Sequence, residues 1–95
     1  MAVLELAKVQ NEQRSDIINK FLDAQTKSIG IQTAQKILQT KGSIYQVYKY
    51  QYDKGYLNKD DLNNAEIDVL KAKIGLKKAI AEYNIAILKY NQMLR

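Results

Sequence analysis

The chain has 95 residues, a formal net charge of +5, and no proline, cysteine or histidine. Disulfides, thiolate chemistry, histidine bases and histidine metal ligands are therefore excluded, and we expect neither an enzyme nor a cofactor or metal site. At this length one small domain, residues 1–95, is expected. No apolar run approaches the ~20 residues of a membrane-spanning helix.

One turn, at Gly55–Asn58, organises the rest of the sequence. Gly55 accepts the left-handed backbone conformation that ends many helices. Asn58 is a favourable helix cap, and the aspartates at 60 and 61 fall in the first turn after it, where carboxylates suit the helix dipole. This capping role also accounts for the acidic cluster better than a metal site does. The pattern predicts a helix that stops, a short loop and a second helix.

We predict an all-α fold, a long antiparallel two-helix coiled-coil hairpin with helices over about 3–54 and 59–94. The alternative is a three-helix bundle with a break near Gly30. Gly30 and Gly42 each cost roughly 1 kcal/mol relative to alanine inside a helix. Neither is followed by a cap and a first-turn carboxylate, so one continuous helix is favoured, and Gly42 is expected to admit a close partner. The first seam is Ile17, Phe21, Ala24, Ser28, Ile31, Gln35, Leu38, Gly42, Tyr45, Lys49 and Tyr52.

The second predicted helix carries apolar stripes on two opposite sides. Its packing seam repeats every seven residues, with alanine at alternate positions that lets helix axes approach closely. A helix in a lone hairpin needs one stripe, so two stripes indicate two neighbours, in a ring or barrel of helices or a dimeric bundle. The plainer alternative is a helix in an ordinary three-helix core. The seam is Leu62, Ala65, Val69, Ala72, Leu76, Ala79, Tyr83, Ala86 and Tyr90, and the second packing stripe is Ile67, Leu70, Ile74, Ala81, Ile85 and Leu88.

Basic residues are in excess after residue 70. A basic face can attract nucleic acid or anionic lipid. Aromatic stacking residues are not interleaved with these lysines, so a solvated helix face is the favoured interpretation and no nucleic acid is expected. The residues are Lys71, Lys73, Lys77, Lys78, Lys89 and Arg95, against Glu82 alone.

About half the chain, Tyr45 to Leu94, resembles the periplasmic helical hairpin of TolC-like outer-membrane efflux proteins. That family shows an aromatic residue shortly before a turn glycine, an aspartate six residues after it, then leucine or valine and an alanine. Alanine and leucine follow at heptad spacing, with aromatics near the helix end. The matching residues are Tyr52, Gly55, Asp61, Leu62 and Ala65, then Leu70, Ala72, Leu76, Ala79, Tyr83, Ala86, Tyr90 and Leu94.

The resemblance implies a trimeric channel, in which two such hairpins per protomer form a ring of helices below a membrane β-barrel. It implies a fragment that is periplasmic in its outer-membrane parent. The mixed-charge helical pattern that follows the first residues predicts that the segment itself is soluble and has no signal peptide. Asp61 corresponds to the acidic position at the pore entrance, and Asn64 stands where one family hairpin has a second acid. The tip residues expected to dock on a periplasmic adaptor (membrane fusion) protein are Tyr52, Gly55, Tyr56 and Leu57.

Three hypotheses follow. The first is a hairpin of an efflux or type I secretion channel that works by helix packing and tip docking. The second is a free-standing scaffold or adhesin-like module that self-associates through its second stripe. The third, least favoured, is a basic binder of nucleic acid or a membrane surface.

Overall fold

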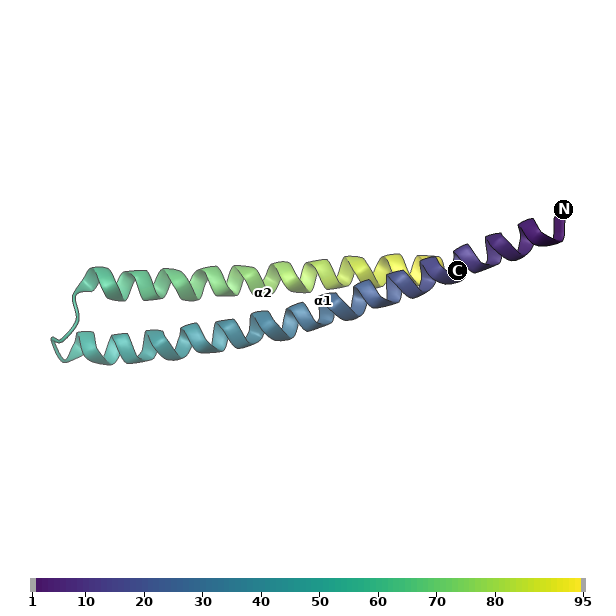
Figure 1. Cartoon of the computed structure of the whole chain (residues 1–95). Helices are drawn as coiled ribbons and strands as arrows, with labels where there is room; N and C mark the ends of the chain where they lie inside the picture. Colours follow the sequence, from purple (N-terminus) through teal and green to yellow (C-terminus); the bar gives the residue numbers. More distant parts are fainter. Residues whose placement is uncertain (1, 95) are drawn as a thin grey trace.

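The computed structural model describes the backbone of residues 2–94 and the side chains of residues 8 and 10–94. It contains two helices, α1 (Ala2–Asp53) and α2 (Lys59–Met93), which lie antiparallel in a rod of 80 × 15 × 15 Å (Figure 1). This confirms the predicted two-helix hairpin. Because α1 continues through Gly30 and Gly42, the three-helix alternative is wrong.

Gly30 and Gly42 do not interrupt α1, because neither is followed by a capping residue and a first-turn carboxylate that would start a new helix. Gly55 is the only glycine of the described chain with a positive φ, +83°. A Cβ added at Gly42 would meet no atom within 4 Å. Gly42 therefore faces open space in the hairpin, rather than the close partner that its place in the seam suggested.

A glycine-centred hydrogen-bond pair closes the end of α1. The N–H of Gly55 donates to the carbonyl of Tyr52 at 3.0 Å, and the N–H of Tyr56 donates to the carbonyl of Gln51 at 2.8 Å. These two bonds satisfy carbonyls that a helix end otherwise leaves without partners, and they need the left-handed conformation at Gly55. Helix α1 thus ends at Asp53, one residue before the expected boundary.

Asn58 begins α2 as its sequence position suggests. Its backbone is extended, and its side-chain oxygen accepts a hydrogen bond from the N–H of Asp61 at 2.8 Å. Asp60 and Asp61 lie in the first turn, where their charge is favourable beside the free N–H groups. Only a short loop separates the two caps, so the chain reverses direction within a few residues.

Two side-chain contacts between the helices define their antiparallel register. The rings of Phe21 and Tyr90 lie 5.8 Å apart between centroids, with a tilt of 52°. Lys27 Nζ lies 3.9 Å from a carboxylate oxygen of Glu82, a half-exposed pair of the kind that contributes little to stability. Between these contacts, Ala24 lies level with Ala86.

Among the described side chains, only three apolar ones are buried in the hairpin, and all are alanines. Ala24, Ala65 and Ala86 retain 5%, 4% and 3% of their surface. The hairpin exposes 7658 Å², whereas a compact monomer of this mass exposes roughly 5,600 Å². The chain therefore has a contact seam but no core of large side chains.

The residues of α1 that contact α2 differ in part from the expected seam. Phe21, Gln35 and Lys49 from the expected seam are exposed. Half-buried residues instead lie at both flanks of the residues that recur every seven positions from Ile17. Lysines take part because their aliphatic stems cover apolar surface while the ammonium stays in water. The half-buried residues on this second flank are Lys20, Lys27, Ala34, Lys41 and Tyr48.

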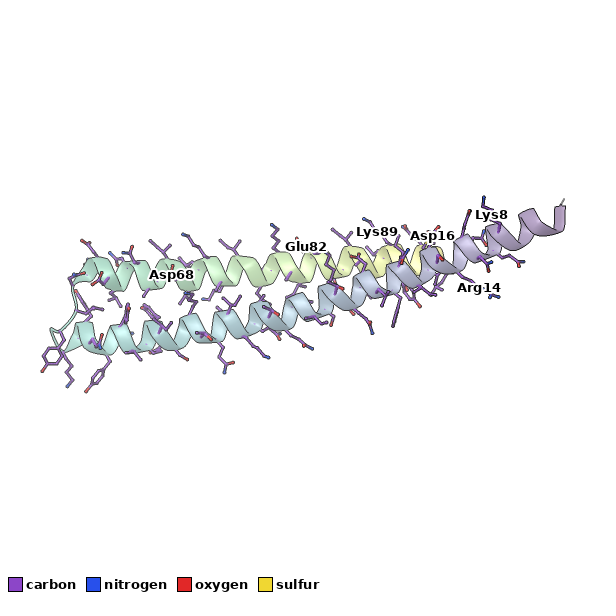
Figure 2. The ribbon with its side chains drawn as sticks, viewed as in Figure 1. Lys8, Arg14, Asp16, Asp68, Glu82 and Lys89 are labelled. Atoms are coloured by element: carbon purple, nitrogen blue, oxygen red, sulfur yellow. The ribbon has the colours of Figure 1, made fainter. Side chains whose placement is uncertain are left out.

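Helix α1 is longer than α2 and extends past it at the open end of the hairpin (Figure 1). The extension carries Lys8, Arg14 and Asp16, which point into solvent (Figure 2). Residues 10–16 are all exposed. Within residues 2–94, neither helix is long and apolar enough to cross a membrane.

Two glycine substitutions test this account of the turn. Gly30→Ala should stabilise the protein by about 1 kcal/mol, because alanine favours the helix and a Cβ there meets nothing within 4 Å. Gly55→Ala should destabilise it by about 1 kcal/mol or more, because φ is +83° although the space is equally open. Urea unfolding followed by circular dichroism measures both. Equal effects of the two changes would contradict the left-handed cap.

Candidate functional site

The tip of the hairpin presents one aromatic side chain fully to solvent. Tyr56 retains 82% of its surface, whereas Leu57 is half-buried against the helix ends. Gly55 is exposed, and Tyr52 retains 37%. Leu57 thus supplies the apolar contact that often accompanies a glycine helix end. Tyr56 is left free as an amphipathic anchor of the kind that is enriched at protein interfaces.

A cation and an acid flank this aromatic tip. Lys54 Nζ lies 5.6 Å from the centroid of the Tyr50 ring, a cation–π contact at the last turn of α1. Asp61 is exposed in the first turn of α2, and its N–H is held by the Asn58 cap. The cap thus fixes the backbone that carries the acidic side chain. The tip combines an exposed tyrosine with both signs of charge on a short, hydrogen-bonded loop.

All nine residues of the predicted α2 seam face α1. Ala65 and Ala86 are buried, and the other seven are half-buried. The register places the large residue Tyr45 of α1 level with Ala65 of α2. Near the turn a large side chain of α1 thus lies over a small one of α2, whereas Ala24 and Ala86 bring two small side chains together.

The second stripe of α2 faces solvent on the side opposite the seam. Its exposed fractions run from 46% at Ile67 to 66% at Ile74, and Ala81 is also exposed. Leu88 retains 60%. A contiguous exposed apolar row of this kind is typical of interaction surfaces. Nothing in the hairpin itself covers it.

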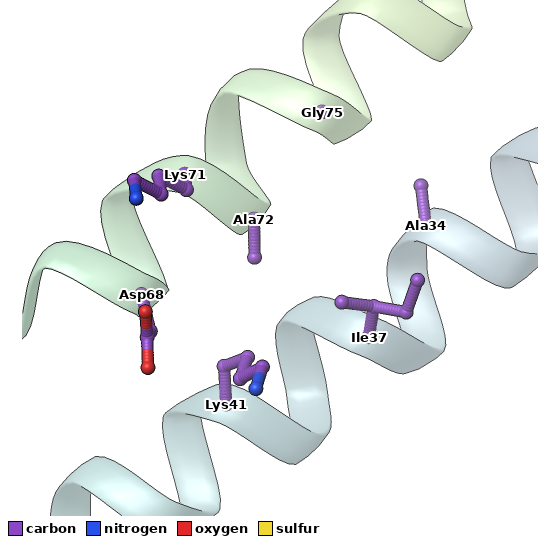
Figure 3. A pocket seen from close by; sticks show the side chains of 7 residues that line it. All are labelled: Ala34, Ile37, Lys41, Asp68, Lys71, Ala72 and Gly75. Atoms are coloured by element: carbon purple, nitrogen blue, oxygen red, sulfur yellow. The ribbon is translucent and has the colours of Figure 1, made fainter. Parts of the chain in front are cut away.

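Two grooves run between the helices, one on each side of the seam. The larger, of about 300 Å³, opens where small side chains from both helices face each other (Figure 3). Protein interiors are close-packed, so an unfilled groove here shows that the seam alone does not complete the packing. Its lining is Ala34, Ile37, Lys41, Asp68, Lys71, Ala72 and Gly75.

The groove on the other side, of about 200 Å³, lies near the open end of the hairpin. It is bordered by the ring pair Phe21 and Tyr90 and by the polar side chains of Gln25 and Ser28. The two grooves differ in chemistry, because the first is rimmed by lysine and aspartate whereas the second is uncharged.

An uncharged polar row on α1 was missed by the apolar pattern. It begins at Gln25 and Ser28 and continues with Gln32, Gln35, Gln39 and Gln46. The glutamines are exposed and Ser28 is half-buried. The sequence contains this polar periodicity, because these residues lie one or four positions after the residues that recur every seven positions from Ile17. Reading the polar positions by the same period as the apolar ones finds it.

Among the described side chains, those of residues 8 and 10–94, no group of three or more acidic ones is close enough to hold a metal ion. In the same range, no buried side-chain nitrogen or oxygen lacks a hydrogen-bond partner. The features available for function are therefore surfaces: the tip, the second stripe, the grooves and the glutamine row.

Comparison of the chain with protein-family models, curated protein sequences and solved structures finds no match.

The seam makes a testable distinction between two alanines of α2. Ala86→Leu should destabilise the hairpin by about 1–3 kcal/mol, because Ala86 is 3% exposed and lies level with Ala24. Ala72→Leu should cost less or stabilise, because Ala72 borders the larger groove and the added carbons can enter it. Thermal melting of the two variants beside the parent measures the difference. Equal melting temperatures in the two variants would contradict the described packing.

Proposed function

We propose that this chain is a helical hairpin of an outer-membrane efflux or type I secretion channel. In that role it forms part of the periplasmic α-barrel, and its loop is the tip that docks on the adaptor protein. The hairpin acts by packing and docking, with no catalytic step. This assignment develops the resemblance to TolC-like proteins and rests on three features of the structure.

The exposed second stripe of α2 is the observation that carries the proposal. Ile67, Ile74 and Leu88 stand on the side away from α1 and retain about half or more of their surface. A helix with apolar rows on both sides is suited to a wall of helices, where each has a neighbour to either side. Burying both rows requires at least one further helix beyond the hairpin.

The missing core supports the same conclusion. A surface surplus of roughly 2,000 Å² over a compact monomer exceeds the ~800 Å² that each partner buries in a standard interface. An assembly of hairpins therefore has ample area available. Conversely, a solitary hairpin would leave about 18 large apolar side chains in water.

The tip supports the docking part of the proposal. Tyr56 is exposed on a loop whose backbone is fixed on one side by the Gly55 hydrogen bonds and on the other by the Asn58 cap. A rigid loop loses little conformational entropy when a partner covers it. The exposed tyrosine then supplies apolar area and a hydroxyl to the interface.

The docking proposal predicts that Tyr56→Ala weakens binding to an adaptor hairpin from the same organism by roughly tenfold or more, as expected for loss of an aromatic anchor. Ile29→Ala, at an exposed position far from the tip, should leave binding unchanged. Biolayer interferometry measures the affinities, and circular dichroism checks that helicity is kept. Binding that ignores Tyr56 but responds to Ile29 would contradict tip docking.

A free-standing, self-associating module is the second candidate, and the charge distribution of α2 favours it. The first part of α2 is acidic, with Asp60, Asp61, Glu66 and Asp68, and the part from Lys71 onward is basic. Two α2 helices packed antiparallel through their second stripes would bring opposite charges together. Such a module needs no tip partner, so an assembled chain that fails to bind any adaptor would favour it over the channel hairpin.

Both candidates predict that the second stripe drives assembly. The double variant Ile74→Glu with Leu88→Glu should lower the mass of the assembled protein in multi-angle light scattering, because charges in an apolar interface are costly. Lys73→Glu changes the net charge by the same amount on a neighbouring face, so it serves as the control and should keep the assembled mass. An unchanged mass in the double variant would overturn both candidates.

A further inference from the structure

The two broad sides of the hairpin differ sharply in charge along α1. The two flanks of α1 are defined relative to the residues that recur every seven positions from Ile17. Residues one and four positions after these lie on one flank, and residues one before and three after lie on the other. The first flank holds the row of Gln25, Ser28, Gln32, Gln35, Gln39 and Gln46, here the glutamine row, and the only charged residue that borders this row from Ile18 to Gln46 is Lys36, four positions after Gln32. The second flank, here the charged flank, holds Asp16, Lys20, Asp23, Lys27 and Lys41.

The two grooves show which residues of α2 lie on each of these two sides. Gln25 and Ser28 border one groove, and Lys41 borders the other with Asp68 and Lys71 (Figure 3). The ion pair of Lys27 with Glu82 lies on the charged flank. On the glutamine side, the same helical register gives α2 four charged residues, which are Lys59, Glu66, Lys73 and Lys77. The hairpin therefore has one charge-rich and one charge-poor side.

The edges of the hairpin lie between these two sides. Ile29 on α1 retains 62% of its surface and Ile74 on α2 retains 66%, each facing away from the other helix. If further copies cover both edges, the two broad sides are the surfaces that stay in contact with water. In a closed ring of hairpins, one of them becomes the inner wall.

We infer that the glutamine row lines the water-filled interior of the assembly and that the charged flank faces outward. This inference rests on the proposed function. Identical charges repeated around a narrow ring repel one another, and the low-dielectric wall concentrates their field. Outside the ring, bulk salt screens the same charges within about 10 Å. Glutamine amides keep hydrogen bonds with water in either place, so the charge-poor side is the one suited to the interior.

The inner wall contributed by α1 would then carry a single charged residue, Lys36, over about 32 Å, the rise from Gln25 to Gln46 at ~1.5 Å per residue. Such a lining gives hydrogen bonds to a passing solute along most of its length. The transported class matched to this stretch of α1 is therefore polar solutes.

Single cysteines test the orientation cleanly, because the chain has no cysteine of its own. Gln32→Cys places a thiol on the glutamine row, and Asp23→Cys places one on the charged flank. Both positions are exposed in the hairpin. The molar mass of each variant is first measured by light scattering. The variant is then treated with N-ethylmaleimide or with a polyethylene glycol maleimide too large to enter a ring of helices.

In the assembled protein, Gln32→Cys should react with N-ethylmaleimide and lose its reaction with the large reagent, whereas Asp23→Cys should react with both. An assembled Gln32→Cys variant that reacts with both reagents, or with neither, would overturn the orientation and leave the proposed assembly standing. A chain that stays monomeric at all concentrations would overturn the proposed function, and the inference with it.

Discussion

Helix α2 meets α1 along a row of alanines, and this contact sets the character of the whole molecule. Ala65 and Ala86 bring the helix axes together, yet each removes little apolar area from water because the side chain is a single methyl group. Larger seam residues such as Leu76 are only half-buried. A seam built this way holds two helices in register but leaves most of the apolar surface uncovered.

The tip is organised differently, because backbone hydrogen bonds rather than packing determine its shape. Gly55 closes α1 and Asn58 opens α2, each with hydrogen bonds between residues no more than five positions apart. The loop therefore keeps its form without help from a core. A surface for docking at the end of a long rod needs this independence, since the rod is only two helices wide there and offers no support from behind.

These local rules explain which parts of the structure could be predicted from the sequence. The reversal at Gly55 and the Asn58 cap depend on neighbouring residues alone and could therefore be predicted. The α2 seam repeats every seven residues without a skip, so the face of α2 that packs on α1 could also be predicted. The contact line of α1 was predicted less well, because its heptads offer Lys27 on one flank and Ser28 on the other. Only the partner helix decides between them. The glutamine row was overlooked because it has no apolar signal, and whether Tyr56 meets an adaptor depends on a second molecule.

The glycines of the helical arms are concentrated in the middle of the rod. Gly30 and Gly42 of α1 lie on either side of the level at which Gly75 occurs in α2, and a Cβ at any of the three would meet nothing within 4 Å. Gly42 is followed by Ser43, a pairing at which long helices commonly bend. The bending stiffness of the rod is therefore lowest at its centre. Sideways force on the loop would flex the shaft there, so that the far end holds its place while the loop swings.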